Sequence, residues 1–443
     1  MKRRVLILGS GISGLVAAVH LVRAGFRVTL LEKRPFAGGR TYSFRKPFWP
    51  FSIDNGPHVM LGAYTALLDF LKLVGGQHLV RGQKRLRIPY LLPGGKKSEL
   101  RAAGLPAPLH LAAGLWRFPL LDRPAKLALT RAFFQITRLG DSLQLDEITA
   151  ADWLKKAEQP ELAERIFWRP LVLATLNAEP EQVSFLQLFR VLKLGFLAGK
   201  AESRIFTFPA GLTPTLIEPA LRWLEKNGGS IYCRRGVQRL QFSGERVTAV
   251  ETAHGRLKDF GAVISALPAH ALADLFRRSS GPGPEWADQI AFTSQPILNL
   301  HFWLPEPLLA DSFAALVGIR GQWLFRSRER KGQVHHTLVV SGAGQLLTEP
   351  RERLIAGLLD ELKGIFPKFR RESVQKHYLV IEKRATILSS PGVEALRPPP
   401  GKFAGNFFLA GDWTRTGLPP TMESAARSGL MAAEAVLRWQ KER

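Results

Sequence analysis

The sequence of 443 residues predicts an α/β fold, in which a domain built on a parallel sheet is interleaved with a second, α+β domain. A short apolar run near the start of the chain is followed directly by a glycine-rich turn and a helix-like segment. Two more apolar runs, at residues 262–268 and 406–410, are typical of buried strands. With 46% hydrophobic and 22% charged residues, the composition is that of a globular protein, and the length suggests two or three domains.

The first element is a strand at residues 5–8, which leads into the turn Gly9-Ser10-Gly11-Ile12-Ser13-Gly14. Residues 15–24 have helical spacing and stop at Gly25, and a second strand at 27–31 ends at Glu32. This order of strand, G-x-G-x-x-G, helix, strand and acid predicts a Rossmann-like dinucleotide-binding unit. A glycine turn without a ligand would explain the turn but not the whole series.

Each residue type in this unit has a mechanical role. Gly9 permits the tight turn, Gly11 lets the backbone approach a pyrophosphate, and Gly14 allows close helix packing. Glu32 lies 18 residues beyond Gly14, where its carboxylate can accept hydrogen bonds from ribose hydroxyls. The predicted contacts in this unit are Gly9, Gly11, Ile12, Ser13, Gly14, Glu32 and Lys33.

The motifs that follow indicate which dinucleotide is bound. Gly38-Gly39-Arg40 and Asp54-Asn55-Gly56-Pro57-His58 extend the glycine motif. The extended series resembles the FAD-binding signature of the amine oxidase and phytoene desaturase superfamily. The resemblance implies FAD rather than NAD and adds Gly39, Arg40 and Gly56 to the cofactor contacts.

A distant segment has the same signature. Residues 406–412 are typical of a buried strand that ends in Gly411-Asp412, and a helix then opens near Met422. In the resembling superfamily this aspartate contacts the ribityl-pyrophosphate, the helix points its amino end at the flavin, and the backbone at the Val237 position clamps the adenine. A positive helix end would stabilise negative charge on reduced flavin.

These motifs divide the chain into interleaved domains. Residues 1–75, 205–275 and 390–443 are predicted to form an FAD-binding domain of the glutathione-reductase type. Residues 76–204 and 276–389 are predicted to form a substrate and membrane-facing domain. Its apolar strands near Pro296–Leu304 and Gln322–Arg326 would line a hydrophobic tunnel or simply fill a sheet core.

The sequence lacks the motifs of several other kinds of chemistry. No second G-x-G-x-x-G is present, so a reductase of this type would need an unidentified electron donor. A metal site is not predicted, because Cys233 is the only cysteine and the adjacent His335 and His336 would face opposite ways in a strand. The sequence also has no nucleophile elbow and no Walker loop.

Positive charge is concentrated in one part of the chain. There are 62 Lys and Arg against 37 Asp and Glu, a net charge of +25. Residues 84–140 carry eleven basic residues against Glu99 and Asp122, interleaved with large apolar residues and prolines. Two interpretations stay open: contact with an anionic membrane surface, or a solvated cap with an ordinary core. No nucleic-acid partner is predicted, because no recognised module accompanies the charge.

The same data predict a location. No window of 18 uninterrupted apolar residues is present, so no spanning helix is expected. One cysteine favours a reducing compartment. The chain is therefore predicted to be cytoplasmic and peripheral on the inner face of the cytoplasmic membrane.

A narrower resemblance covers nearly the whole chain. It is carried by Pro296–Trp303, Glu382–Thr386, Arg397-Pro398 and the long run Leu409–Glu423, which includes Trp413-Thr414-Arg415-Thr416-Gly417-Leu418-Pro419. With these motifs the chain resembles the hydroxysqualene dehydroxylases, a branch of the phytoene desaturase group.

The resemblance implies reduction of hydroxysqualene, a C30 isoprenoid allylic alcohol, to squalene in squalene and hopanoid biosynthesis. Protonated loss of water would leave a delocalised cation, which hydride from reduced FAD would quench. His58 is the first candidate for the proton donor. Glu382 and Arg384 are candidate cavity-edge residues, although a solvent-exposed charge cluster would explain them equally well.

Three alternatives remain at this stage. A phytoene-type carotenoid or squalene desaturase would use the same fold in the oxidative direction. An amine oxidase is less favoured, because nothing specifies a cationic amine site. A non-catalytic basic membrane-binding flavoprotein is supported by the charge alone.

Overall fold

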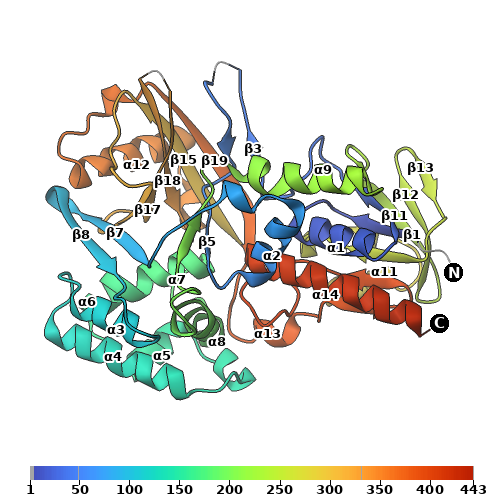
Figure 1. Cartoon of the computed structure of the whole chain (residues 1–443), viewed down its shortest axis with the longest axis horizontal. Coiled ribbons are helices and arrows are strands. Elements are labelled where there is room, and N and C mark those ends of the chain that lie inside the picture. The colour runs from blue at the N-terminus through green and yellow to red at the C-terminus, as the bar shows by residue number, and fades with distance from the viewer. Residues whose placement is uncertain (1–3, 48, 331, 443) are drawn as a thin grey trace.

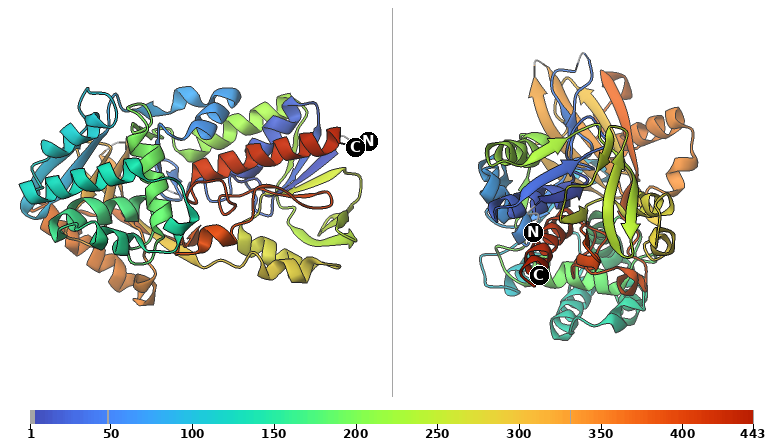
Figure 2. Two further views of the ribbon diagram at one scale, coloured as in Figure 1. Left: turned by 90° about the horizontal axis from the view of Figure 1, so that it is seen from below. Right: turned by 90° about the vertical axis from the view of Figure 1, so that its right-hand side faces the viewer.

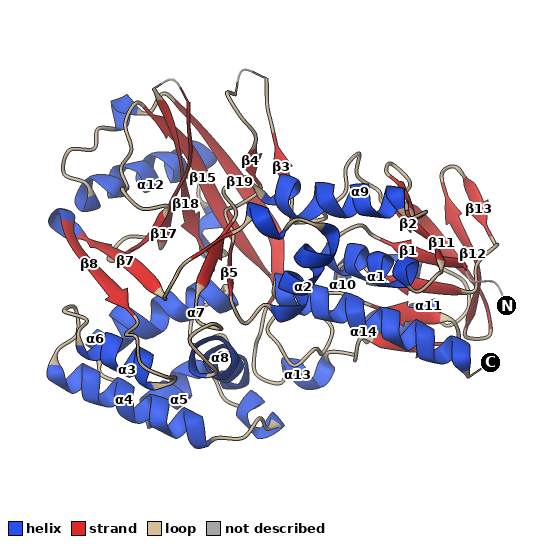
Figure 3. Ribbon diagram, viewed as in Figure 1, coloured by secondary structure: helices blue, strands red, loops and turns tan. Residues whose placement is uncertain are grey.

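The computed structural model describes residues 4–47, 49–330 and 332–442, so residues 1–3 of the first predicted segment lie outside it. The molecule is elongated, with a nucleotide-binding lobe at the end that carries both termini and a second lobe at the other end (Figure 1). The two further views in Figure 2 show the termini side by side at that end. The helices and strands of both lobes are shown in Figure 3.

A six-stranded sheet forms the centre of the nucleotide-binding lobe. Its order is β10-β2-β1-β14-β21-β20, and all neighbours are parallel except β20 and β21. The strands are β1 (Arg4–Leu8), β2 (Arg27–Leu31), β10 (Ser230–Tyr232), β14 (Ala262–Ser265), β20 (Gly401–Ala404) and β21 (Phe407–Leu409). Every strand comes from one of the three segments predicted for this domain.

Alternate side chains of this sheet enter two different cores. Val5 and Ile7 of β1 pack with the helices α1 (Ile12–Arg23), α2 (Thr65–Val74), α9 (Glu218–Lys226) and α14 (Met422–Lys441). Leu6 and Leu8 face the other way. They pack with β11 (Val237–Ser243), β12 (Arg246–Thr252), β13 (Gly255–Leu257) and α10 (Ala269–Arg277). A parallel strand buried on both faces needs the continuous apolar run that the sequence shows.

The second lobe contains a seven-stranded sheet of order β19-β15-β18-β17-β16-β7-β8, antiparallel except for β16 and β7. Its strands are β7 (Arg87–Leu92), β8 (Lys96–Arg101), β15 (Ser294–Leu304), β16 (Phe313–Leu316), β17 (Trp323–Arg330), β18 (Gln333–Val340) and β19 (Lys376–Ile387). One face packs on α12 (Arg351–Ile365). His335 and His336 are both buried in β18: His335 stacks on His301 and His336 on Phe302.

Helices cover the other side of the second lobe. They are α3 (Leu109–Trp116), α4 (Arg123–Arg138), α5 (Ala150–Lys156), α6 (Glu161–Ala163), α7 (Arg169–Leu176) and α8 (Phe185–Arg190). Asp122 caps α4 by accepting from the Ala125 N–H at 2.9 Å, and Thr149 and Asp152 form a capping box on α5. None of the helices in the described ranges is long and apolar enough to cross a membrane.

The two lobes meet through small sheets and one segment whose boundary differs from prediction. β5 (Val59–Leu61), β9 (Ile205–Thr207) and β6 (Arg81–Gly82) form a sheet across three predicted segments, and β3 (Ser43–Phe44) pairs with β4 (Ile53–Asp54). α11 (Gly283–Asp288) belongs to the segment 276–389 predicted for the substrate domain, yet its Ala287 packs in the nucleotide-side core. α13 (Val393–Leu396), from the segment 390–443 predicted for the FAD-binding domain, packs in the same core through Val393.

Candidate active site

A cavity of about 950 Å³ extends from the six-stranded sheet, past one face of the seven-stranded sheet, to the helices α3, α4 and α7. We distinguish a cofactor arm, lined by the glycine-rich turns, from an apolar arm in the second lobe. The predicted residues that line the cavity are Gly9, Gly11, Ile12, Ser13, Glu32, Lys33, Gly39, Arg40, Gly56, His58, Val237, Glu382, Arg384, Gly411, Asp412 and Met422. Gly14 is the one predicted site residue that does not line it.

The turn after β1 forms a cradle for a diphosphate. Gly9 has a φ of +100°, and Gly11 is the N-cap of α1 without any side-chain capping bond, so the helix N–H groups stay free. A Cβ at Gly11 would meet no atom within 4 Å, whereas a Cβ at Gly14 would lie 2.1 Å from the Gly9 carbonyl oxygen. Gly11 therefore leaves room on the ligand side, and Gly14 lets the helix pack against the turn. Free helix N–H groups with open space suit a pyrophosphate.

Glu32 lies beside this turn at the end of β2. Its Oε2 accepts from the Ser10 N–H at 3.1 Å and the Ser10 hydroxyl at 2.7 Å, and its Oε1 accepts from the Arg34 N–H at 2.8 Å. Glu32 as a whole is only 6% exposed. These bonds hold a negative charge at the edge of the cofactor arm, where a ribose hydroxyl would donate.

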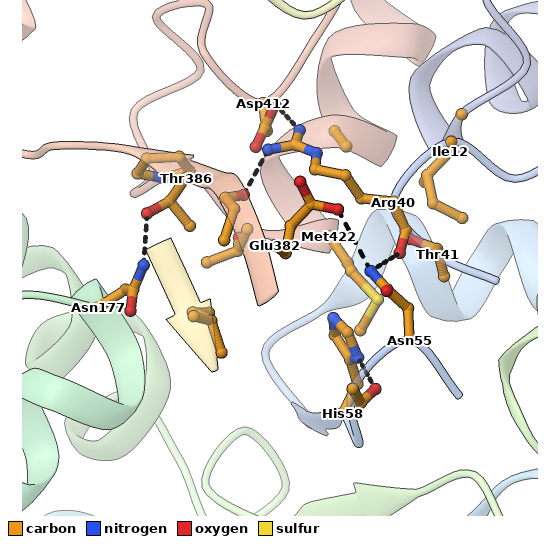
Figure 4. Close-up of a pocket in the computed structure, with 18 of the residues that line it drawn as sticks. Ile12, Arg40, Thr41, Asn55, His58, Asn177, Glu382, Thr386, Asp412 and Met422 are labelled. Carbon is orange, nitrogen blue, oxygen red and sulfur yellow. Dashed lines mark hydrogen bonds and ion pairs between the residues drawn. The ribbon is translucent and has the colours of Figure 1, made fainter. Parts of the chain in front are cut away.

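An ion pair joins the two distant cofactor motifs. The Arg40 guanidinium contacts Asp412 Oδ1 at 2.6 Å and donates to the Ala385 carbonyl at 2.5 Å (Figure 4). These residues come from the Gly-Gly-Arg motif, the Gly-Asp motif and β19. The ion pair therefore fixes both cofactor segments to the second sheet.

The loop at 411–418 is held by a buried arginine that the sequence did not identify as functional. Arg397 is 1% exposed and donates to the carbonyls of Asp412, Trp413, Thr414 and Leu418 at 2.5–3.2 Å. It also pairs with Glu394 at 2.9 Å, which in turn contacts Arg190 at 2.7 Å. Arg397 stands in the Arg-Pro motif of the sequence, but nothing in that motif indicates what the arginine does.

Helix α14 begins at the cavity. Its N-cap Thr421 accepts from the Ser424 N–H at 3.3 Å, and Thr421, Met422 and Ala425 line the cavity. The Glu423 carboxylate turns away and accepts from Ala66 and Leu67 N–H groups at 3.0 Å, so it caps α2. The N-terminus of α14 therefore faces the cavity, while the carboxylate in its first turn, Glu423, is bound to the start of α2.

His58 lies where the two arms meet. Its Nδ1 is 2.7 Å from the Gly56 carbonyl oxygen, which can only accept, so Nδ1 carries the hydrogen of the neutral ring. Burial lowers the pKa of His58, and the charge of Arg40 adds to this effect against the opposing influence of Gly56 and Asp54. Figure 4 shows the other ring nitrogen pointing into the cavity. At neutral pH this Nε2 presents a lone pair, so the predicted donor must gain a proton before it can give one.

Glu382 and Arg384 both line the cavity but have different neighbours. Glu382 Oε2 accepts from the Asn55 amide at 3.4 Å (Figure 4). The Asn299 amide donates to the Asn55 carbonyl at 3.3 Å. Arg384 lies instead within electrostatic range of His270 on α10, whose pKa is lowered by burial and then by that arginine. Arg384 therefore belongs to the cofactor arm. Asn55 and Asn299 lie within the motifs at 54–58 and 296–303, but the sequence does not predict them as site residues.

Beyond Glu382–Arg384 at its junction with the cofactor arm, the apolar arm has no charged side chain among the lining residues that the structure describes. Its lining residues include Leu86, Ile88, Tyr90, Leu100, Leu111, Leu115, Phe133, Phe167, Leu171, Leu173, Phe196, Ile205, Phe313, Trp323 and Phe325. Burial raises the pKa of Tyr90 well above its usual value, so its hydroxyl stays neutral. The predicted strands at 296–304 and 322–326 do contribute to this wall, through Ile297, Trp323 and Phe325. Within the described ranges, no cluster of three or more His, Cys, Asp or Glu is placed to hold a metal.

Comparison with known proteins identifies the family. The model of flavin containing amine oxidoreductases matches residues 12–437. Hydroxysqualene dehydroxylases of Rhodopseudomonas palustris and Sinorhizobium fredii are 31% and 30% identical to this chain, with 99% of each chain covered. A 15-cis-phytoene desaturase of Synechococcus elongatus is 23% identical, over 99% of this chain and 97% of its own.

Solved structures show the same fold. An oxidoreductase from Methanosarcina mazei has a TM-score of 0.73 at 15% identity, covering 98% of this chain and 100% of its own. Putrescine oxidase bound to putrescine has a TM-score of 0.71 at 17% identity, with 99% of both chains covered. The predicted fold class and the FAD cofactor are confirmed. The chain belongs to the flavin-containing amine oxidoreductase family, as an FAD-dependent oxidoreductase that groups with the hydroxysqualene dehydroxylases.

Proposed function

We propose that this enzyme reduces hydroxysqualene to squalene, as a step of squalene and hopanoid biosynthesis. The observation that carries the proposal is the uncharged apolar arm, which opens onto the cofactor arm beside His58 and Glu382. The full-length similarity to hydroxysqualene dehydroxylases, above that to phytoene desaturases, supports it. A cationic amine would find no charged partner in this arm, so the putrescine-type reaction is disfavoured.

The reaction breaks the C–O bond of the alcohol and forms a C–H bond at the same carbon. The hydroxyl oxygen takes up a proton and leaves as water, and the carbon takes up a hydride. Bound reduced FAD supplies that hydride and becomes oxidised. The apolar arm would hold the hydrocarbon chains and exclude the water that would otherwise trap an allylic cation.

Within this reaction we propose His58 as the proton donor. The Nε2 of His58 faces the cavity, and a charged imidazolium there would be stabilised by the negative charge of Asp54, which favours the protonated ring. Because burial lowers the pKa of His58, the donor form becomes more populated as the pH falls. The rate of squalene formation should therefore rise towards acidic pH.

Replacing His58 with Asn is expected to slow squalene formation by about 10²–10⁴-fold and to abolish the acidic rise in rate. Flavin content should stay close to that of wild type, because the Asn amide can still donate to the Gly56 carbonyl that His58 Nδ1 contacts. Single-turnover rates between pH 5.5 and 8 measure both effects. A variant with the wild-type rate and pH profile would remove His58 from the mechanism.

The direction of the reaction is tested by product analysis of two parallel incubations. Reduced enzyme with hydroxysqualene under nitrogen should give squalene. Oxidised enzyme with squalene or a phytoene-like polyene and an electron acceptor should give no new conjugated absorbance. The opposite pair of results would make the protein a desaturase, and peroxide release on addition of polyamines would make it an amine oxidase.

We also propose that the enzyme works as a peripheral protein on the inner face of the cytoplasmic membrane. Its isoprenoid substrate is insoluble in water, and a net charge of +25 favours an anionic surface. A separate electron donor would reduce the flavin, since the sequence offers no second dinucleotide motif.

A further inference from the structure

Helix α3 presents large apolar side chains to solvent. Leu105, Leu109 and Trp116 are 46%, 57% and 45% exposed, although each has an apolar side chain that folding normally buries. The run from 102 to 116 contains no Lys, Arg, Asp or Glu, and the exposed Arg117 follows it. We call Leu105, Leu109 and Trp116 the α3 patch. Grouped exposed apolar residues of this kind mark an interaction surface.

The next helix presents basic and apolar residues along one stripe. Arg123, Leu127, Arg131, Phe134 and Arg138 follow one another at intervals of three or four, so they share a face of α4, and all five are exposed. Leu127 and Phe134 are 45% and 55% exposed. The Arg138 guanidinium lies 3.9 Å from the centre of the Phe134 ring. We call these five residues the α4 stripe.

Negative charge is nearly absent from this region. From residue 102 to residue 140 the one acidic residue is Asp122, and its carboxylate is used to cap α4. Apolar side chains flanked by unopposed arginines match the boundary between the headgroups and acyl chains of an anionic bilayer. A soluble acidic protein would match the charges but would not require exposed Leu109 and Trp116.

The same helices form a wall of the apolar arm. Leu111 and Leu115 of α3 and Phe133 of α4 line the cavity, while the adjacent Trp116 and Phe134 point outward. The cavity is therefore separated from the exposed surface by the thickness of one helix. Figure 1 places α3 and α4 at the end of the molecule opposite the termini and the nucleotide-binding sheet.

We propose that the α3 patch and the α4 stripe dock the enzyme on an anionic bilayer, and that the isoprenoid passes beside α3 and α4 into the apolar arm. Leu109 and Trp116 enter the acyl region, and the arginines of the stripe contact lipid phosphates. Docking depends only on this surface. The passage of substrate rests on the proposed function.

The docking surface is tested by co-sedimentation of the full-length FAD-loaded protein with vesicles. Binding is expected to vesicles of phosphatidylglycerol and phosphatidylethanolamine, to weaken with salt, and to be at least tenfold weaker on phosphatidylcholine alone. Two double variants, Leu109→Gln with Trp116→Gln and Arg131→Glu with Arg138→Glu, should each bind at least about tenfold less. Leu396→Gln is the matched control, because Leu396 is 64% exposed on α13, away from the patch.

Two outcomes would overturn the docking proposal. One is wild-type vesicle binding by both double variants with normal flavin content. The other is a wild-type dimer in solution that becomes monomeric in the Leu109→Gln, Trp116→Gln variant, since a second copy would then cover the patch.

Turnover separates docking from the proposed function. With substrate embedded in vesicles, both double variants should lose at least about tenfold in rate, whereas detergent-dispersed hydroxysqualene should be converted at the wild-type rate. Equal losses in both formats would contradict an entrance at the membrane. If wild-type enzyme binds vesicles but converts no hydroxysqualene, the proposed function is wrong, whereas the docking surface is still supported.

Discussion

Replacing Arg397 with Leu is expected to yield protein that holds little FAD. The guanidinium donates to four carbonyls of the 412–418 segment and pairs with Glu394, all in a region where the arginine is 1% exposed. Removing it leaves these acceptors and the Glu394 carboxylate without their donor. Loss of one partner of a buried charged pair costs about 3–5 kcal/mol.

The lost contacts should weaken FAD binding, because the loop at 411–418 contains Gly411 and Asp412, which line the cofactor arm. We expect the dissociation constant of FAD to rise at least about 100-fold and the unfolding temperature to fall. Arg397→Lys should be intermediate, since it keeps the charge but supplies three donors instead of five. Arg415→Leu, in the same loop but exposed, should resemble wild type.

The measurements are flavin content after purification, FAD titration of the apoprotein, and thermal unfolding with and without FAD. Wild-type flavin affinity in Arg397→Leu would show that the loop does not need this arginine.

Two glycine variants in the first turn should have different effects. One fills the space left for the ligand, and the other disturbs the packing of α1 against the turn. Gly14→Ala would place a Cβ 2.1 Å from the Gly9 carbonyl oxygen, a distance that forces α1 away from the turn. We expect it to yield little folded protein. Gly11→Val meets no protein atom within 4 Å at its Cβ, and the φ of −68° suits any residue, so the protein should fold.

Gly11→Val should nevertheless bind FAD at least about 100-fold more weakly, because the added side chain occupies the space left for the pyrophosphate. Circular dichroism of the apoprotein and FAD titration measure the two effects. Gly364→Ala is the matched control, since a Cβ there also meets nothing. Full FAD affinity in Gly11→Val would place the diphosphate elsewhere.

Much of the cofactor arm could be predicted because its residue types are determined by the local backbone conformation. A turn that lets a strand meet a helix end needs glycine at defined positions, and an acid at the end of the next strand needs only the right spacing. Parallel strands buried on both faces also leave continuous apolar runs. These requirements are visible within about 30 residues.

The remaining features depend on contacts between distant segments. Arg397 acts on carbonyls 15–21 residues away, and no periodicity marks such an arginine. Glu382 and Arg384 both line the cavity, as expected of cavity-edge residues, but the sequence does not show that Glu382 meets Asn55 and that Arg384 acts on His270. The segment around α11 was misassigned because its apolar residues, such as Ala287, show their partners only in three dimensions.

In the proposed reaction the cavity holds an allylic C30 alcohol, and reduced FAD supplies a hydride to the carbon that bears the hydroxyl. The most direct measurement is a single anaerobic turnover in which flavin absorbance and squalene are quantified in the same sample. We expect oxidation of the reduced flavin only when hydroxysqualene is added, with about one squalene formed per flavin oxidised. Flavin that stays reduced in the presence of hydroxysqualene, with no squalene formed, would show that the enzyme does not catalyse this reduction.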